Sequence, residues 1–292
     1  MAVVYRSGRL HVGGGELAYR LLPKAVEQAM PPVVMVGGWG STMNDWFSLS
    51  DELARRLGAP VLLFDHRGIG ESCDHPGTIT MDELAGDTLA LAEALLPGNR
   101  FVVVGHSAGA FLAQHLAIRA PERVAAIVCL SGQGPRSSAV SGSGKFFKLA
   151  RSTLHNSEDV EARMELLSYH LFPFERDALG RGLHGMSARS LRDRRPKATI
   201  EAQLRMLSKA DLGPELGSIR CPVLIVHGRA DAVVPPENAE RLFHAVSGSA
   251  FRRVAMLERR HMPFAPGLEA AREVAGEVAA FLAECRRPTS KL

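Results

Sequence analysis

The chain has 292 residues, of which 46% are hydrophobic and 23% are charged, and its formal net charge at pH 7 is +4. This length and composition are ordinary for a globular protein that can bury a large core. The weak charge, with no basic run interleaved with aromatic residues, argues against nucleic-acid binding. No apolar stretch approaches the roughly 18 residues that a membrane span needs.

Cysteine usage and short motifs exclude further classes of site. None of the cysteines belongs to a C-x-x-C pair, which predicts reduced thiols in an intracellular compartment for Cys73, Cys129, Cys221 and Cys285. The N-terminus lacks the charged segment and long apolar run of a secretory signal. There is no H-E-x-x-H motif and no cysteine pair, and the glycines at 13–15 do not belong to a strand–turn–helix unit of the kind that binds dinucleotides, so we expect neither a metal nor a cofactor.

Strand-like and helix-like segments alternate along the chain. The first 30 residues predict an antiparallel hairpin with its turn at 13–15. Near-continuous apolar runs then predict strands at 33–38, 61–65, 101–106, 124–132, 222–228 and 251–258. Helices are predicted at 45–57, 80–96, 108–119, 237–246 and 267–286. Strands that are apolar along their whole length are covered on both faces, so this order predicts an α/β fold with a doubly wound sheet.

Some helix ends carry their own signals. Thr80 and Glu83 have the spacing of a capping box, in which each side chain satisfies a free backbone amide at the start of a helix. Gly58 and Gly98 follow helical stretches, as C-terminal caps do.

The alternation stops between about 135 and 213. This stretch opens on a Gly/Ser-rich segment, continues with a helical pattern and contains no predicted strand. It predicts a helical cap at 135–213 on a core built from 1–134 and 214–292. Residues 136–212 hold 14 Lys and Arg against 9 Asp and Glu. The basic excess has two interpretations, a solvated outer face of short helices or the attraction of an anionic substrate group.

Ser107 is the candidate nucleophile. It lies in GHSAG at 105–109, between an apolar strand and a helix-capable segment. In a G-x-S-x-G elbow the chain turns so sharply that the serine is strained, and glycine two positions away on each side avoids Cβ clashes. The hydroxyl is then exposed at a helix start, where amide dipoles favour developing negative charge.

A serine hydroxyl needs a base, and the base needs an orienting carboxylate. His261 follows the predicted strand 251–258, and Asp231 follows the predicted strand 222–228. Both therefore lie at the edge of the sheet where sites in open α/β sheets gather. The chain order Ser107, Asp231, His261 is the order expected for this scaffold.

The other histidines near these motifs are given different roles. His106 adjoins the serine and cannot readily face its hydroxyl. His227 ends a strand and is predicted to be structural, whereas His66 and His75 lie in a polar loop and are expected to be exposed.

Two loops complete the predicted site. The oxyanion of a tetrahedral intermediate needs preorganised donors, and the backbone N–H of Ala108 supplies one. The backbone N–H of Trp39, in the glycine-rich loop GGWG at 37–40, is expected to supply the other, with its indole walling the pocket. In the loop 65–72, Asp65 and Arg67 are predicted to form a structural pair that braces this edge of the sheet.

These motifs resemble those of the α/β-hydrolase superfamily. The resemblance covers about 210 residues and rests on GGWG, DHRGIGES, VGHSAG, VLIVHGRADAVVP and RRHMPF, in that order. It implies an eight-stranded, mostly parallel sheet flanked by helices, with a helical cap inserted after the sixth strand. The chain has Gly37-Gly38 where many members carry His-Gly. A serine nucleophile differs from the aspartate of the related dehalogenases and epoxide hydrolases.

The leading functional hypothesis is a serine hydrolase that cleaves a carboxylic ester through an acyl-enzyme, with Ser107 as nucleophile, His261 as base and Asp231 as its orienter. One alternative is an acyl-CoA thioesterase or a carbon–carbon bond hydrolase with the same triad. Another alternative is a ligand-binding receptor that reuses the pocket.

The chain ends in Ser290-Lys291-Leu292, after a basic segment. A C-terminal S-K-L is a peroxisomal address that an import receptor reads. We therefore predict a peroxisomal location and the import receptor as a partner. The alternative is a chance occurrence in a bacterial protein, which would otherwise be cytoplasmic.

Overall fold

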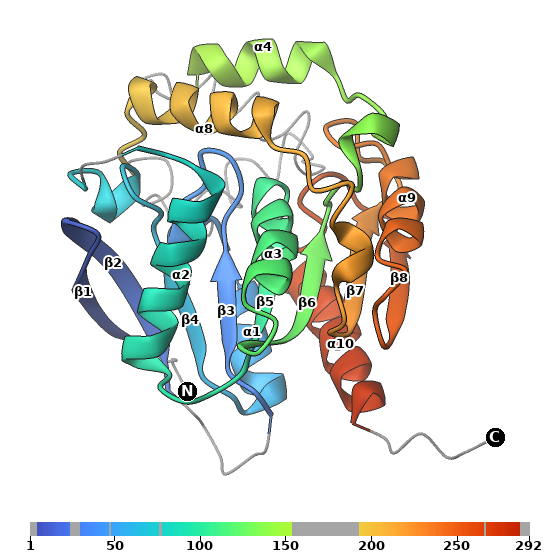
Figure 1. Cartoon of the computed structure of the whole chain (residues 1–292), viewed down its shortest axis with the longest axis horizontal. Helices are drawn as coiled ribbons and strands as arrows, with labels where there is room; N and C mark the ends of the chain where they lie inside the picture. The colour runs from blue at the N-terminus through green and yellow to red at the C-terminus, as the bar shows by residue number, and fades with distance from the viewer. Residues whose placement is uncertain are drawn as a thin grey trace.

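An eight-stranded sheet forms the centre of the protein (Figure 1). The structure, a computed structural model, describes residues 5–23, 30–46, 48–75, 78–153, 193–265 and 267–286. The strands lie in the order β1-β2-β4-β3-β5-β6-β7-β8. Their bounds are β1 Arg6–Val12, β2 Gly15–Leu22, β3 Val33–Val36, β4 Val61–Phe64, β5 Phe101–His106, β6 Val124–Leu130, β7 Val223–Gly228 and β8 Arg252–Leu257. Strand β2 pairs antiparallel with β1 and β4, and all other neighbours pair in parallel, which confirms the expected mostly parallel sheet.

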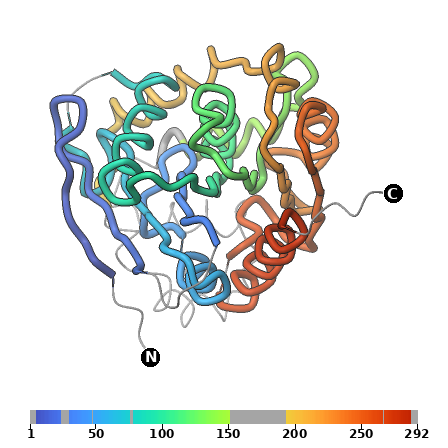
Figure 2. Tube along the Cα trace, turned by 60° about the horizontal axis from the view of Figure 1, so that its bottom comes forward, coloured from blue at the N-terminus to red at the C-terminus, as the bar shows by residue number. Residues whose placement is uncertain are grey.

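Helices cover both faces of this sheet (Figure 2). Because successive side chains of a strand point to opposite faces, each buried strand contributes to two cores. Met35 and Val104 pack in the core with α1 and α10, whereas Val34 and Val103 pack in the core with α2, α3 and α9. The helix bounds are α1 Leu49–Leu57, α2 Met81–Leu95, α3 Ala108–Arg119, α9 Glu237–Ala245 and α10 Gly267–Cys285.

The segment inserted after β6 lies across the C-terminal ends of the strands (Figure 1). Its described part is helical and contains η3 Arg136–Ser138, α4 Gly144–Thr153 and α8 Lys197–Lys209. Residues 154–192 lie outside the described residues, so the predicted boundaries of the cap stay a prediction. Residues 290–292 also lie outside them, and the role of the C-terminal tripeptide stays a prediction as well.

Most element boundaries agree with the predicted ones to within a few residues. Strand β3 ends at Val36, two residues early, which leaves Gly37 and Gly38 in a loop. The capping box of Thr80 and Glu83 is present at the start of α2. Gly58 caps α1 in the left-handed conformation, with φ 60°. The expected cap at Gly98 is wrong, because α2 already ends at Leu95 and its cap residue is Leu96.

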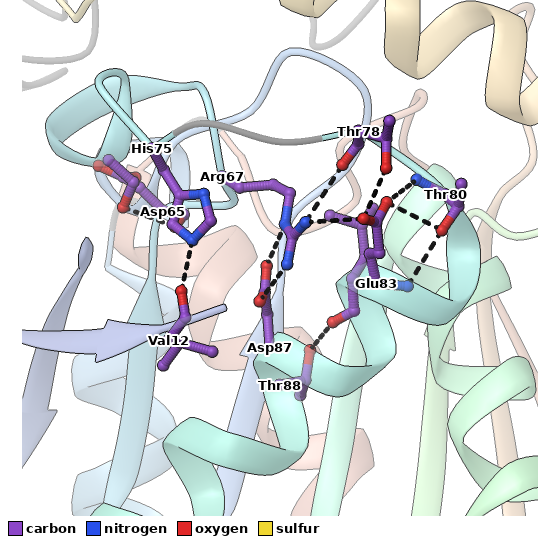
Figure 3. Close-up of polar contacts among 11 residues, drawn as sticks. Val12, Asp65, Arg67, His75, Thr78, Thr80, Glu83, Asp87 and Thr88 are labelled. Carbon is purple, nitrogen blue, oxygen red and sulfur yellow. Dashed lines mark hydrogen bonds and ion pairs between the residues drawn. The ribbon is translucent and has the colours of Figure 1, made fainter. Parts of the chain in front are cut away.

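Arg67 braces the edge of the sheet, but through a different partner from the predicted one (Figure 3). Its Nε and Nη2 donate to the two carboxylate oxygens of Asp87 on α2, both at 2.7 Å. Asp65 instead accepts the backbone amides of Met43 and Glu71, at 2.6 and 2.7 Å. Both side chains are structural, as expected, but they do not pair with each other, because the helix brings a closer carboxylate to Arg67.

Replacing Arg67 with alanine should lower the free energy of unfolding by about 3–5 kcal/mol, because it leaves the carboxylate of Asp87 buried without its counter-charge. That side chain is 1% exposed. Urea denaturation at pH 7 measures the loss. Arg9→Ala is the matched control, since its ion pair with Glu16 lies in solvent, with side chains 48% and 58% exposed. It should change stability by less than about 1 kcal/mol. Equal losses in the two variants would contradict the prediction.

Two histidines expected to be exposed are buried instead. His66 is 3% exposed and His75 is 7% exposed. The Nε2 of His75 donates to the carbonyl of Val12, 2.7 Å away, and so ties its loop to β1 (Figure 3). Their polar sequence did not predict this burial, because it depends on contacts with other segments: His75 with β1 and His66 with the loop after β3, where its Nε2 lies 3.3 Å from the carbonyl oxygen of Gly37. Among the described residues no helix combines the length and the apolar character that would let it cross a bilayer.

Candidate active site

Ser107 occupies the strained turn between β5 and α3. Its backbone has φ 54° and ψ −116°, in a region that residues other than glycine rarely adopt. A Cβ added at Gly105 would lie 2.2 Å from the carbonyl oxygen of Gly109, and a Cβ added at Gly109 would lie 2.0 Å from the carbonyl oxygen of Val36. Only glycine fits at both positions, which is the physical basis of the G-x-S-x-G spacing.

The structure brings the three predicted side chains into one hydrogen-bonded chain. The Oγ of Ser107 lies 3.0 Å from the Nε2 of His261. The Nδ1 of the same ring lies 2.9 Å from the Oδ2 of Asp231. A carboxylate can only accept, so Nδ1 carries the ring proton and Nε2 is free to accept the serine proton.

Asp231 is held ionised at the end of this chain. Burial by itself would raise the pKa of its carboxyl, but His261 and His227 outweigh that effect and hold the pKa below its usual range. Its Oδ1 also accepts the backbone amides of Val233 and Val234, at 2.8 and 2.9 Å. These bonds fix the carboxylate in one orientation, with Oδ2 directed at His261.

His106 holds the other side of the His261 segment. Its Nε2 donates to the backbone carbonyl of His261, 2.9 Å away, so its ring faces away from the serine hydroxyl as expected. Burial lowers the pKa of His106 to about 3, which keeps the ring neutral. Phe264 packs edge-on against the same ring, with centroids 5.2 Å apart. This contact of His106 could not be predicted from the sequence, because its partner lies 155 residues away in the chain.

The loop after β3 lies directly against the nucleophile. A Cβ added at Gly38 would be 3.2 Å from the Cβ of Ser107, so the absence of a side chain at this position lets the loop approach. The next residue, Trp39, borders the same cavity as Ser107 and Ala108. In the described part of the chain, the backbone N–H groups of Trp39 and Ala108 donate to no protein acceptor. Both therefore remain available to a group bound at Ser107.

A cavity of about 620 Å³ opens over Ser107 and His261. Its wall is largely apolar and includes Trp39, Phe111, Phe146, Phe147, Leu204 and Leu207. The indole of Trp39 stands in this wall, where its Nε1 donates to the carbonyl of Ile200 on α8, 2.9 Å away. Arg136 is an exposed cation of the wall, and Arg195 lines it while paired with Asp45 at 3.0 Å. Within the described ranges no three His, Cys, Asp or Glu side chains gather as metal ligands would.

Comparison with protein families and with curated proteins gives consistent matches. Residues 31–263 match the family model described as the alpha/beta hydrolase fold. The protein named as a carbamate hydrolase, RutD, from Klebsiella pneumoniae strain 342 is 30% identical over 229 residues, which cover 77% of this chain and 82% of the relative. The RutD protein of Escherichia coli O127:H6 is 29% identical over 223 residues, which cover 75% of this chain and 80% of the relative.

Solved structures share the architecture over nearly the whole chain. A hydrolase from Pseudomonas aeruginosa PA01 aligns with a TM-score of 0.74 at 24% identity and covers 94% of this chain and 98% of its own. The enol-lactonase from Burkholderia xenovorans LB400 aligns with a TM-score of 0.75 at 23% identity and covers 94% of this chain and all of its own, at 100%. At these sequence identities the similarity shows a shared fold and nothing about the substrate.

Proposed function

Because the chain belongs to the α/β-hydrolase fold family and is a hydrolase of that family, we propose that it cleaves a carboxylic ester through a covalent acyl-enzyme. One observation carries this proposal. The Asp231, His261 and Ser107 side chains form an unbroken hydrogen-bonded chain that ends at a serine in the wall of a large, mostly apolar cavity. That arrangement supplies a nucleophile, a base and a substrate site together.

In the first half of the proposed reaction, the Oγ of Ser107 attacks the ester carbonyl while the Nε2 of His261 takes the hydroxyl proton. Ionised Asp231 stabilises the imidazolium that forms. The carbonyl oxygen becomes an oxyanion, and the backbone N–H groups of Trp39 and Ala108 donate hydrogen bonds to it. Collapse of the intermediate breaks the bond to the alkoxy group, which leaves as an alcohol with the proton from His261.

The second half repeats the sequence with water as the attacking group. His261 takes a proton from water, and the hydroxide adds to the carbonyl of the acyl-Ser107 ester. The second oxyanion forms at the same two amides. Its collapse breaks the bond to Oγ, releases the acid and returns the proton to Ser107.

The cavity favours an apolar acyl group of moderate size. Its volume of about 620 Å³ lies within the range of small-molecule sites, and aromatic and aliphatic side chains dominate its wall. The relatives named as a carbamate hydrolase and an enol-lactonase act, by those names, on carbonyl carbons that bear a heteroatom leaving group. This chemistry supports acyl transfer over carbon–carbon cleavage as the reaction of this chain.

A second candidate reaction is the hydrolysis of an acyl-CoA thioester. Arg136 is exposed and borders the cavity, where it could attract the phosphates of coenzyme A. The basic excess of residues 136–212 also favours this thioesterase hypothesis. It predicts a KM that rises with salt, because screening weakens attraction between exposed charges.

A panel of substrates tests the proposed function. Purified protein is treated with a fluorophosphonate probe, and its turnover is measured on p-nitrophenyl esters and CoA thioesters of graded acyl length. Labelling at Ser107 with rapid turnover of the esters supports the proposal. Rapid turnover of the thioesters alone, with a salt-sensitive KM, supports the second candidate. Labelling without any turnover supports a ligand-binding receptor, and the absence of both labelling and turnover contradicts the proposal.

A further inference from the structure

The loop at residues 39–45, which contains Trp39, is hydrogen-bonded to the segment inserted after β6. Residues 193–203 of that segment make several hydrogen bonds to residues 39–45. The carboxylate of Asp193 accepts from Thr42 and from Asn44. The carbonyl of Ile200 accepts from the indole of Trp39. Residues 39–45 follow strand β3 closely in the sequence. The inserted segment nevertheless makes many of the hydrogen bonds that hold them.

Two buried side chains of the insertion hold both polar groups of Gly40. The Oε1 of Gln203 accepts the N–H of Gly40 at 2.9 Å, and the Nε of Arg195 donates to its carbonyl at 2.7 Å. Gln203 is 3% exposed and Arg195 is 7% exposed. Gly40 has φ 69°, a conformation that favours glycine and that these two bonds hold in place.

The bond from Arg195 continues along the backbone to the peptide unit of the Trp39 N–H, the proposed oxyanion donor. The carbonyl of Gly40, which Arg195 bonds, shares its peptide unit with the N–H of Ser41. This N–H donates to the carbonyl of Gly38 at 3.1 Å. The carbonyl of Gly38 in turn shares its peptide unit with the N–H of Trp39. The Arg195 guanidinium thus begins a chain of two hydrogen-bonded peptide units that ends at the proposed oxyanion donor. Such chains polarise each successive N–H, which strengthens the last donor.

We propose that Arg195 and Gln203 are positioning residues of the catalytic reaction: both fix the peptide units of Gly40 next to Trp39, and Arg195 also polarises the Trp39 N–H toward the oxyanion. This inference rests on the proposed function. An oxyanion donor acts only where it is fixed before the charge develops, because reorientation would consume the stabilisation that it provides. The insertion therefore contributes to the chemical step as well as to the wall of the cavity.

Gln203→Met tests the inference, with Gln203→Glu as the conservative variant that keeps an acceptor oxygen for Gly40. We expect Gln203→Met to lower kcat about tenfold or more while KM changes less than twofold, since removal of an oxyanion donor itself lowers kcat about 100- to 1,000-fold. Inhibition by a trifluoromethyl ketone, which forms an oxyanion on the serine, should weaken by a similar factor. Gln203→Glu should keep more of the wild-type kcat than Gln203→Met, because it keeps the acceptor for Gly40, although its buried charge costs part of the rate.

Arg195→Lys gives a second measurement that does not depend on the folding of Gln203→Met. Lysine keeps a positive charge beside Asp45 but cannot present the Nε geometry to Gly40. We expect a fall in kcat of about tenfold, by the same argument. Arg194→Lys is the matched control, because the neighbouring Arg194 is exposed and pairs with Asp74 at 3.2 Å. It should leave kcat and KM unchanged.

The outcomes separate this inference from the proposed function. Wild-type protein without ester turnover or labelling would contradict the proposed function itself. Wild-type turnover, with kcat unchanged in both Gln203→Met and Arg195→Lys, would overturn only the positioning role. A rise in KM or a loss of thermal stability with unchanged kcat would also overturn it, since that pattern indicates packing of the insertion alone.

Discussion

Replacement of Ser107 by alanine is expected to lower kcat for ester hydrolysis by at least about four orders of magnitude, because the acyl-enzyme can no longer form. The variant should fold normally, since alanine fits the same turn and the two flanking glycines remain. Steady-state turnover of a p-nitrophenyl ester measures the effect. Mass spectrometry after fluorophosphonate treatment should find the probe on the Ser107 peptide of wild type and no labelling of the variant.

Ser131→Ala provides the matched control for this experiment. Ser131 follows β6, is fully buried and also has a positive φ, at 49°. Its hydroxyl has no hydrogen-bond partner among the described residues. The control variant should therefore keep wild-type turnover and labelling. Ester turnover by Ser107→Ala within tenfold of wild type would exclude the proposed nucleophile.

Asp231→Asn is expected to lower kcat about 10,000-fold through the tautomer of His261. The Oδ1 of Asp231 accepts the amides of Val233 and Val234, so the asparagine oxygen must occupy that position. Its NH₂ group then faces the Nδ1 of His261 as a donor. Nδ1 must become the acceptor, and the ring proton moves to Nε2, which can no longer accept the proton of Ser107. Turnover of the same ester measures this loss.

Asp82→Asn is the matched control, because it changes an aspartate that is also hydrogen-bonded to a histidine. The Oδ1 of Asp82 lies 2.8 Å from the Nε2 of His115, and the Asp82 side chain is 81% exposed. This pair lies outside the proposed catalytic chain, so its variant should keep kcat. If Asp231→Asn keeps more than a tenth of the wild-type kcat, His261 does not need this carboxylate to act as a base.

The hydrogen bonds from residues 193–203 to residues 39–45 change how the insertion is understood. The sequence suggested two roles for its basic residues, a solvated surface or attraction of an anionic group. Arg195 does neither in the structure, because it is buried and bonds the carbonyl of Gly40 and the carboxylate of Asp45. Substitutions of this segment that aim to change substrate choice are therefore expected to change the chemical step as well.

Features that depend on near neighbours could be predicted from the sequence. The apolar runs fixed the strands, because strands covered on both faces must be apolar throughout. The capping box of Thr80 and Glu83 and the cap at Gly58 depend on residues within one helical turn. The elbow around Ser107 depends on glycines two positions away, which the G-x-S-x-G pattern reveals in the sequence, although the strand that requires Gly109 is distant in the chain.

Features that depend on contacts between distant segments were predicted less well. Arg67 pairs with Asp87, 20 residues further on, because α2 packs beside the loop. His66 and His75 are buried, although their sequence is polar. Neither outcome leaves a local trace, since the side chains that surround these residues come from other elements.

The sequence by itself determined the α/β architecture and the candidates Ser107, Asp231 and His261, because parallel strands bring their C-terminal ends to one edge of the sheet. Only the tertiary structure decided how those candidates are held. It directs the ring of His106 to the carbonyl of His261 and brings Arg195 and Gln203 to Gly40. These bonds join residues more than 150 positions apart. The first exists only once the loop after β8 has packed against β5, and the other two exist only once the insertion has packed over the sheet.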